Sequence, residues 1–336
     1  KRILMAYTTI DNPELYFQVK TWTGTGSSNA LTLDGDENMQ PDYVMIKQRS
    51  STQQWNGYDS VRGVQKYLGW NTNIAENTQA QGLTAFGSDG FTVGTDDMVN
   101  KSSETYVAFC WKESATAGFD IVSYTGNGSN RTLSHGLSQK PDMIIIKRRN
   151  TTGNWTVYHS TLTVSKYIYL HLTNAAETAG ASSYWQTSEP TSSVVSLGTD
   201  GDVNGSSDTY ISYFFCNKQG FSKFGSYSGN ASTNGPYLHL GFKPAWFMTK
   251  KSNGSKDWNI YDNKRSDSGG GNANDQYLEA NNNAAEQSGQ DVDLLSNGVK
   301  IRSTSNEVNG DGNDFIYMAF AEAPFVNSSG VPANAR

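Results

Sequence analysis

The chain has 336 residues, of which 17% are charged, and its net charge is -6 with a pI of about 5.3. It carries no basic stripe and no apolar run of the ~18 residues that span a bilayer, so we expect neither nucleic-acid binding nor membrane insertion. Aromatic residues make up 12%, enough for packed cores despite a mean hydropathy of -0.59. The composition therefore predicts a folded chain rich in uncharged polar residues.

One block of sequence occurs three times. The segment PDYVMIKQR at 41–49 returns as PDMIIIKRR at 141–149 and, less faithfully, as PAWFMTKK at 244–251. Further on, NAAE at 174–177 aligns with NAAE at 283–286. The spacing predicts three homologous units of about 105 residues, a length typical of small domains, which we name unit one, unit two and unit three. They span 15–117, 118–219 and 220–325, between an N-terminal lead (1–14) and a C-terminal tail (326–336).

In chain order, the predicted elements are strands. Residues 43–47 and 143–147 are short apolar runs, typical of strands buried on both faces. Residues 106–111 and 210–216 are aromatic and β-branched, as suits a pleated, half-buried surface. Clusters of Gly, Asn and Asp separate these runs, so the pattern predicts an all-β fold with one antiparallel β-sandwich per unit. Three domains in a row and a pseudo-threefold ring are both compatible with it.

Two smaller predictions concern reactive and charged residues. Cys110 and Cys216 lie in different units, which favours two free buried thiols and assembly in a reducing cytoplasm over a disulfide. The basic run from Lys147 to Arg149 ends a strand, and we expect it to be solvated.

Several motifs resemble one family. They include MAYTTI at 5–10, DSVRG at 59–63, GFTVG at 90–94, SKFGSYSGN at 222–230 and YMAFAE at 317–322. The chain resembles tandem-repeat proteins of unassigned function from marine bacteriophages of the cyanophage and pelagiphage type. The resemblance covers nearly the whole chain. It implies a tail-fibre or other virion-appendage protein with lectin-like β-sandwich repeats of the concanavalin or laminin-G jelly-roll kind, and it supplies no catalytic or ligand residues.

In two units, an acidic and a basic residue recur just after the strand that begins at the recurring Trp. Asp59 and Arg62 in unit one match Asp262 and Arg265 in unit three, whereas unit two has His159 and Leu162. We interpret the pairs as structural ion pairs that hold a turn to the sheet. The alternative is a hydrogen-bonding site for a sugar.

Aromatic residues supply the candidate ligand contacts. Trp55, Trp155 and Trp258 recur in every unit, which is typical of core anchors whose N–H is satisfied, although a sugar-stacking platform is the alternative. Aromatics that differ between units are better binding candidates, because exposed adjacent rings are costly without a use. These candidates are Tyr184 and Trp185, which we expect to be exposed in a Ser/Thr/Gln-rich loop, together with Trp70 and Tyr277.

Acidic loops give weak candidates for a metal site. Carboxylates at Asp200, Asp202, Asp311 and Asp314 could belong to a Ca²⁺ site, which takes ~6–8 oxygen ligands, but the spacing does not match an EF-hand. Asx turns are the favoured interpretation, and no cofactor is predicted. The four His residues are scattered, and no nucleophile motif is present, so we do not expect an enzyme.

The resemblance and the composition together predict a virion-surface protein, assembled in the host cytoplasm, that attaches to a host-surface glycan or protein. Its other expected partners are virion subunits and copies of itself, as a homotrimer. A head-decoration or tail protein without a receptor role is the alternative. A polysaccharide depolymerase is a third interpretation and would need two carboxylates ~5–10 Å apart in a groove.

Overall fold

The computed structural model describes residues 7–178, 180–265 and 272–332. Strands account for 43% of these described residues and helices for 5%, and the paired strands are antiparallel, so the predicted all-β class is confirmed. In the described part of the chain, no helix has the length and apolar character needed to cross a membrane.

One strand order recurs in the main sheet of each unit. The first strand of the unit lies at the edge and pairs with the last strand of the unit. That last strand pairs with the strand that contains the repeated apolar block. The apolar strand pairs in turn with the strand that begins at or next to the recurring Trp. The main sheets are β1 (Phe17–Thr23), β9 (Thr105–Trp111), β3 (Tyr43–Gln48) and β4 (Asn56–Asp59) in unit one; β10 (Phe119–Thr125), β16 (Thr209–Phe215), β12 (Met143–Arg148), β13 (Trp155–His159) and β14 (Ile168–Tyr169) in unit two; and β17 (Ser222–Ser228), β24 (Asp314–Pro324), β19 (Phe242–Lys251) and β20 (Trp258–Asp262) in unit three.

A second, smaller layer accompanies each main sheet. In unit three this layer continues the main sheet through β21, whereas in units one and two it forms a separate sheet. The second layers are β2 (Asn29–Leu31), β8 (Gly90–Val93) and β7 (Leu83–Gly87); β11 (Arg131–Ser134) and β15 (Val194–Leu197); and β21 (Ala273–Glu279), β22 (Gln287–Leu295), β23 (Gly298–Ile301) and β18 (Tyr237–His239). The remaining short elements are η1 (Pro13–Leu15), β5 (Lys66–Tyr67), β6 (Asn77–Thr78), α1 (Asp97–Asn100), α2 (Ala181–Trp185) and α3 (Gly201–Asn204).

Each apolar strand of the repeated block is buried on both faces, as predicted. In β3, Val44 and Ile46 pack with the second layer of unit one in one core. Their neighbours Tyr43 and Met45 belong to a different core. Side chains point to alternate faces along a strand, so this sheet borders one core on each face. A strand in such a sheet needs apolar residues at consecutive positions.

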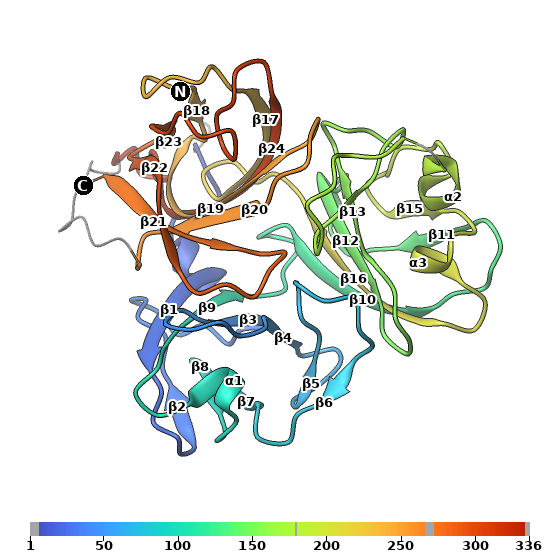
Figure 1. Ribbon diagram of the computed structural model, residues 1–336, viewed down its shortest axis with the longest axis horizontal. Helices are drawn as coiled ribbons and strands as arrows, with labels where there is room; N and C mark the ends of the chain where they lie inside the picture. Colours follow the sequence, from blue (N-terminus) through green and yellow to red (C-terminus); the bar gives the residue numbers. More distant parts are fainter. Residues whose placement is uncertain (1–6, 179, 266–271, 333–336) are drawn as a thin grey trace, which may run out of the picture.

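The second core is common to all three units. Trp111 of unit one lies 6.5 Å from Phe215 of unit two and 5.8 Å from Phe320 of unit three, measured between ring centroids. Phe320 in turn stacks on Phe17 at 5.0 Å. Figure 1 shows the three main sheets grouped around this shared centre, so the arrangement is a pseudo-threefold ring and not a row.

Candidate functional site

Both predicted Asp–Arg pairs are ion pairs. Arg62 Nε lies 2.5 Å from Asp59 Oδ2, and neither side chain is exposed. The Arg62 guanidinium also donates to the Gly57 carbonyl at 2.9 Å. Arg265 and Asp262 form the same pair in unit three, again with both side chains buried. Both pairs are therefore buried ion pairs of the kind that the structural interpretation predicts.

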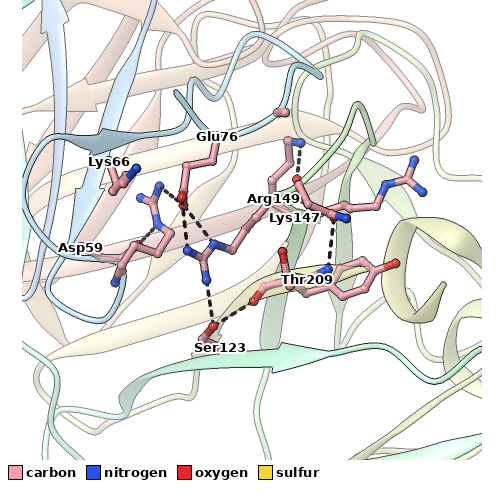
Figure 2. A network of polar contacts seen from close by, with 12 residues as sticks. Asp59, Lys66, Glu76, Ser123, Lys147, Arg149 and Thr209 are labelled. Carbon is pink, nitrogen blue, oxygen red and sulfur yellow. Dashed lines mark hydrogen bonds and ion pairs between the residues drawn. The ribbon is translucent and has the colours of Figure 1, made fainter. Parts of the chain in front are cut away.

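The pair in unit one belongs to a larger network that crosses to unit two. Glu76 accepts hydrogen bonds from Arg149 Nε at 2.9 Å and Nη2 at 3.2 Å, and from Arg62 at 3.4 Å. The Tyr213 hydroxyl of unit two donates to Asp59 at 2.7 Å. Figure 2 shows Glu76 and Arg149 facing each other, with Ser123 beyond the arginine. Each charge in this network has an opposite partner, which desolvated charges need.

The boundary between unit three and unit one carries the same four charged side chains. Glu286 accepts from Arg265 at 2.8 Å, and from Arg49 at 3.0 and 2.7 Å. The backbone confirms the equivalence: Glu286 N donates to the Arg49 carbonyl at 2.8 Å, and Glu76 N donates to the Arg149 carbonyl at 2.7 Å.

The boundary between units two and three lacks these four charges. The corresponding residues are His159, Leu162, Ala176 and Ser252, and Ala176 N donates to the Ser252 carbonyl at 2.8 Å. The carbonyl of Tyr317 can only accept, so His159 Nε2, 3.2 Å away, is the donor. Burial lowers the pKa of His159 to about 4, so this imidazole is neutral at pH 7.

A cavity of about 410 Å³ lies at this third boundary. Leu162 and Ser252, which replace the two arginines of the other boundaries, both line it. Most of its polar lining is exposed, whereas Leu162, Tyr227, Ser252 and Ile316 are buried. The full lining is Thr161, Leu162, Lys166, Ser226, Tyr227, Ser228, Ser252, Asn253, Asp314 and Ile316. We regard this cavity as the candidate functional site.

The recurring tryptophans are core anchors, as predicted, and each reaches across a boundary. Trp55 Nε1 donates to the Glu279 carbonyl at 3.0 Å, and Trp258 Nε1 donates to the Tyr169 carbonyl at 3.0 Å. Trp155 Nε1 donates to the Gly69 carbonyl at 2.9 Å. These indoles cannot stack on a sugar, because each is buried between two units.

The expectation that Tyr184 and Trp185 are exposed is wrong. Tyr184 is 6% exposed and Trp185 0%, since α2 turns both rings into the core between the main sheet and the second layer of unit two. Trp70 and Tyr277 are buried as well, with Trp70 Nε1 donating to the Tyr43 hydroxyl at 2.8 Å. The polar composition of the loop did not predict the burial of these rings, because a single helical turn buries two adjacent side chains.

Trp185→Ala is therefore expected to act on stability. The Trp185 indole packs on Tyr158 and donates to the Lys166 carbonyl at 3.2 Å, so its removal leaves a large cavity. We expect the free energy of unfolding to fall by about 3–5 kcal/mol in a urea titration. An unchanged midpoint would contradict the packing described for α2.

The acidic metal candidates lie in turns and helix starts. Asp200 is the N-cap of α3 and accepts from Asp202 N at 2.8 Å, while Asp202 accepts from Asn154 N at 2.9 Å. Asp314 accepts from the Ser228 hydroxyl at 2.9 Å, and Asp311 is exposed beside a turn. Among the residues that the structure describes, no three His, Cys, Asp or Glu side chains gather at metal-binding distance. A Ca²⁺ site stays the alternative to the favoured Asx turns.

The basic run at 147–149 is not a solvated strand end. Lys147 is fully buried, and its Nζ donates to the Arg148 carbonyl at 2.6 Å and to Asn73 across the boundary at 3.4 Å. Its equivalents Lys47 and Lys250 are buried in the same way. The sequence contains a signal for this burial, namely a lysine at the same position of all three apolar strands.

These three lysines predict a pH dependence of stability. Burial is the main cause that lowers the pKa of Lys47, Lys147 and Lys250 to about 7, from 10.5. Between those values the unfolded chain binds more protons, so the free energy of unfolding must rise with pH. We expect the melting temperature to increase from pH 7 to pH 9, above which ionisation of the unfolded thiols opposes the trend, since burial raises the pKa of Cys110 and Cys216 in the folded chain.

Calorimetry of the wild type and of Lys147→Met at pH 7, 8 and 9 checks this expectation. The variant removes one of the three contributions, so its melting temperature should increase less steeply with pH. A melting temperature that falls from pH 7 to pH 8 in the wild type would contradict the assignment.

Two further predictions can be compared with the structure. Cys110 and Cys216 are free and buried, as expected. The alignment of Glu177 with Glu286 is wrong by one residue, because Ala176 occupies the backbone position of Glu286. Glu177 instead accepts from the Tyr167 hydroxyl at 3.0 Å.

The repeated motifs did not predict the ion partners that complete the networks. Glu76, Glu286, Arg49 and Arg149 lie at equivalent positions of the repeats, and their joint absence at the third boundary is a pattern that only the structural register makes visible. No curated protein shows significant similarity to this chain. A family model does match, over residues 12–324. The chain belongs to this family, which is described as a domain of unknown function (DUF7483).

Proposed function

We propose that the protein is an attachment component of a bacteriophage particle that binds a neutral glycan on the host surface. The observation that carries this proposal is the open cavity at the boundary of units two and three, lined mainly by hydroxyl, amide and apolar side chains. Its volume falls in the ~300–1,000 Å³ range of small-molecule sites. The motifs shared with marine-phage appendage proteins support the virion assignment.

The ring supports a binding role because it holds the cavity rigidly. Main-chain hydrogen bonds and a shared aromatic core fix unit two against unit three, for example Lys256 N to the Thr173 carbonyl at 3.0 Å. A site whose walls are fixed before binding loses little conformational entropy when its ligand arrives. The homotrimer that is expected of a fibre protein stays a prediction. It is distinct from the pseudo-threefold arrangement of the three units within one chain.

Adsorption competition tests the proposal. The purified chain is added to host cells before the phage that encodes it, and free phage is titrated over time, with a phage-unrelated protein of similar size and charge as control. We expect the wild-type chain to slow adsorption in a dose-dependent way and the control protein to have no effect. Undiminished adsorption at saturating folded protein would remove the attachment role and favour a purely structural virion protein.

A further inference from the structure

The cavity is the space that an arginine fills at the equivalent boundary. Arg149 N donates to the Thr209 carbonyl at 2.7 Å, and Ser252 N donates to the Asp314 carbonyl at 2.8 Å, so the two residues occupy the same backbone position. Arg149 reaches from there to Glu76 and to the Ser123 hydroxyl at 3.0 Å. At the third boundary serine replaces the arginine and Ala176 replaces the glutamate, and the space stays open.

Polar groups in the cavity wall lack the partners that their equivalents have. Ser226 corresponds to Ser123, yet its hydroxyl makes no hydrogen bond to the part of the chain that the structure describes. The side chains of Lys166 and Asn253 likewise have no hydrogen bond or ion pair within the described ranges, and both are exposed. These three groups are therefore available to a ligand.

The lining selects the chemistry of that ligand. The hydroxyls of Thr161, Ser226 and Ser228 and the amide of Asn253 suit a molecule with many hydroxyl groups. Buried Leu162 and Ile316, with Tyr227, supply an apolar side. A pyranose ring has this same combination of polar edge and apolar face. Lys166 and Asp314 have opposite charges, so the wall is close to neutral and does not favour an anionic sugar.

We propose that this cavity binds one neutral hexose unit at the end of a glycan chain. The inference rests on the proposed function for its ligand class and for the location of the site, and it adds the number of sugar units and the groups that contact them.

The chain itself provides the design for a variant that closes the cavity. Ala176→Glu together with Ser252→Arg recreates the Glu76–Arg149 pair, which units one and two already accommodate at their boundary. Both charges arrive with a partner, so the variant should fold. Thr52→Arg with Ala80→Glu is the matched control, because it adds the same side chains at exposed positions of unit one.

The test measures sugar binding by saturation-transfer NMR on the full chain, with glucose, galactose, mannose, N-acetylglucosamine and glucuronate as probes. We expect at least one neutral sugar to bind the wild type and the control variant equally, with glucuronate binding no better than glucose. Closing the cavity should weaken that binding at least about tenfold, or ~1.4 kcal/mol. Equal binding by the closed variant, binding of glucuronate alone, or no binding of any probe would overturn the inference.

Adsorption competition with the same variants separates this inference from the proposed function. If the wild type and the closed variant slow adsorption equally, attachment holds and the hexose site is wrong. If the wild type binds a neutral hexose that the closed variant does not, while neither protein slows adsorption, the site holds and the attachment role is wrong.

Discussion

Replacing Asp59 with alanine is expected to lower the free energy of unfolding by about 3–5 kcal/mol. The Arg62 guanidinium would stay buried while losing its closest carboxylate, 2.5 Å away, and its remaining carboxylate partner would be Glu76 at 3.4 Å. Tyr213 would lose its acceptor at the same time. Urea unfolding followed by circular dichroism measures the change.

A coordinated replacement is the matched control for that variant. Asp59→His, Arg62→Leu, Glu76→Ala and Arg149→Ser together install the residues that already form the boundary between units two and three. No buried charge is then left unpaired, so we expect this quadruple variant to lose less stability than Asp59→Ala. A larger loss for the quadruple variant would show that the two kinds of boundary are not interchangeable.

Trp111→Ala is expected to have an effect of similar size, about 3–5 kcal/mol, because it opens a cavity where the three units meet. Trp111 is buried against Phe215 of unit two and against Trp246 and Phe320 of unit three. The loss should therefore destabilise the whole ring. Far-ultraviolet circular dichroism and tryptophan fluorescence should report one common transition at a lower denaturant concentration.

Trp22 provides the control for that prediction. Its ring stacks on Tyr106 at 5.3 Å in unit one, away from the shared core, and it is only partly buried. Trp22→Ala should cost clearly less stability than Trp111→Ala. Two separate unfolding transitions in the Trp111→Ala variant would contradict the shared core, since they would mean that the units unfold independently.

The sequence predicted the strands well, because their burial leaves a local mark. The strand β12 is apolar at four consecutive positions, 143–146, so neither face is polar along this stretch, and this property alone predicts two covered faces. The recurring tryptophans were equally readable, since a large aromatic fixed in every repeat is typical of a core. Local patterns of this kind depend on few neighbours.

The candidate site could not be predicted in the same way, because residues of two different units form it. The position of Ala176 opposite Ser252 depends on how two segments 76 residues apart lie side by side, and an alignment displaced by one residue hides it. The polarity of the loop around Tyr184 was misleading for a related reason. Exposure depends on which way a short helix turns, and composition does not specify that direction.

The contact that closes the ring has a consequence for synthesis on the ribosome. Arg49 meets Glu286, 237 residues later in the chain, so unit one cannot complete its boundary until Glu286, in the second half of unit three, has left the exit tunnel. Until then the inward faces of the earlier units lack the cover that unit three supplies, for example at Trp55, whose indole donates to the Glu279 carbonyl. During this interval nascent chains on one messenger RNA are vulnerable to exchanging units with each other, because every unit presents a similar surface. Slow translation of the last third of the gene would lengthen that interval and increase the yield of intertwined dimers.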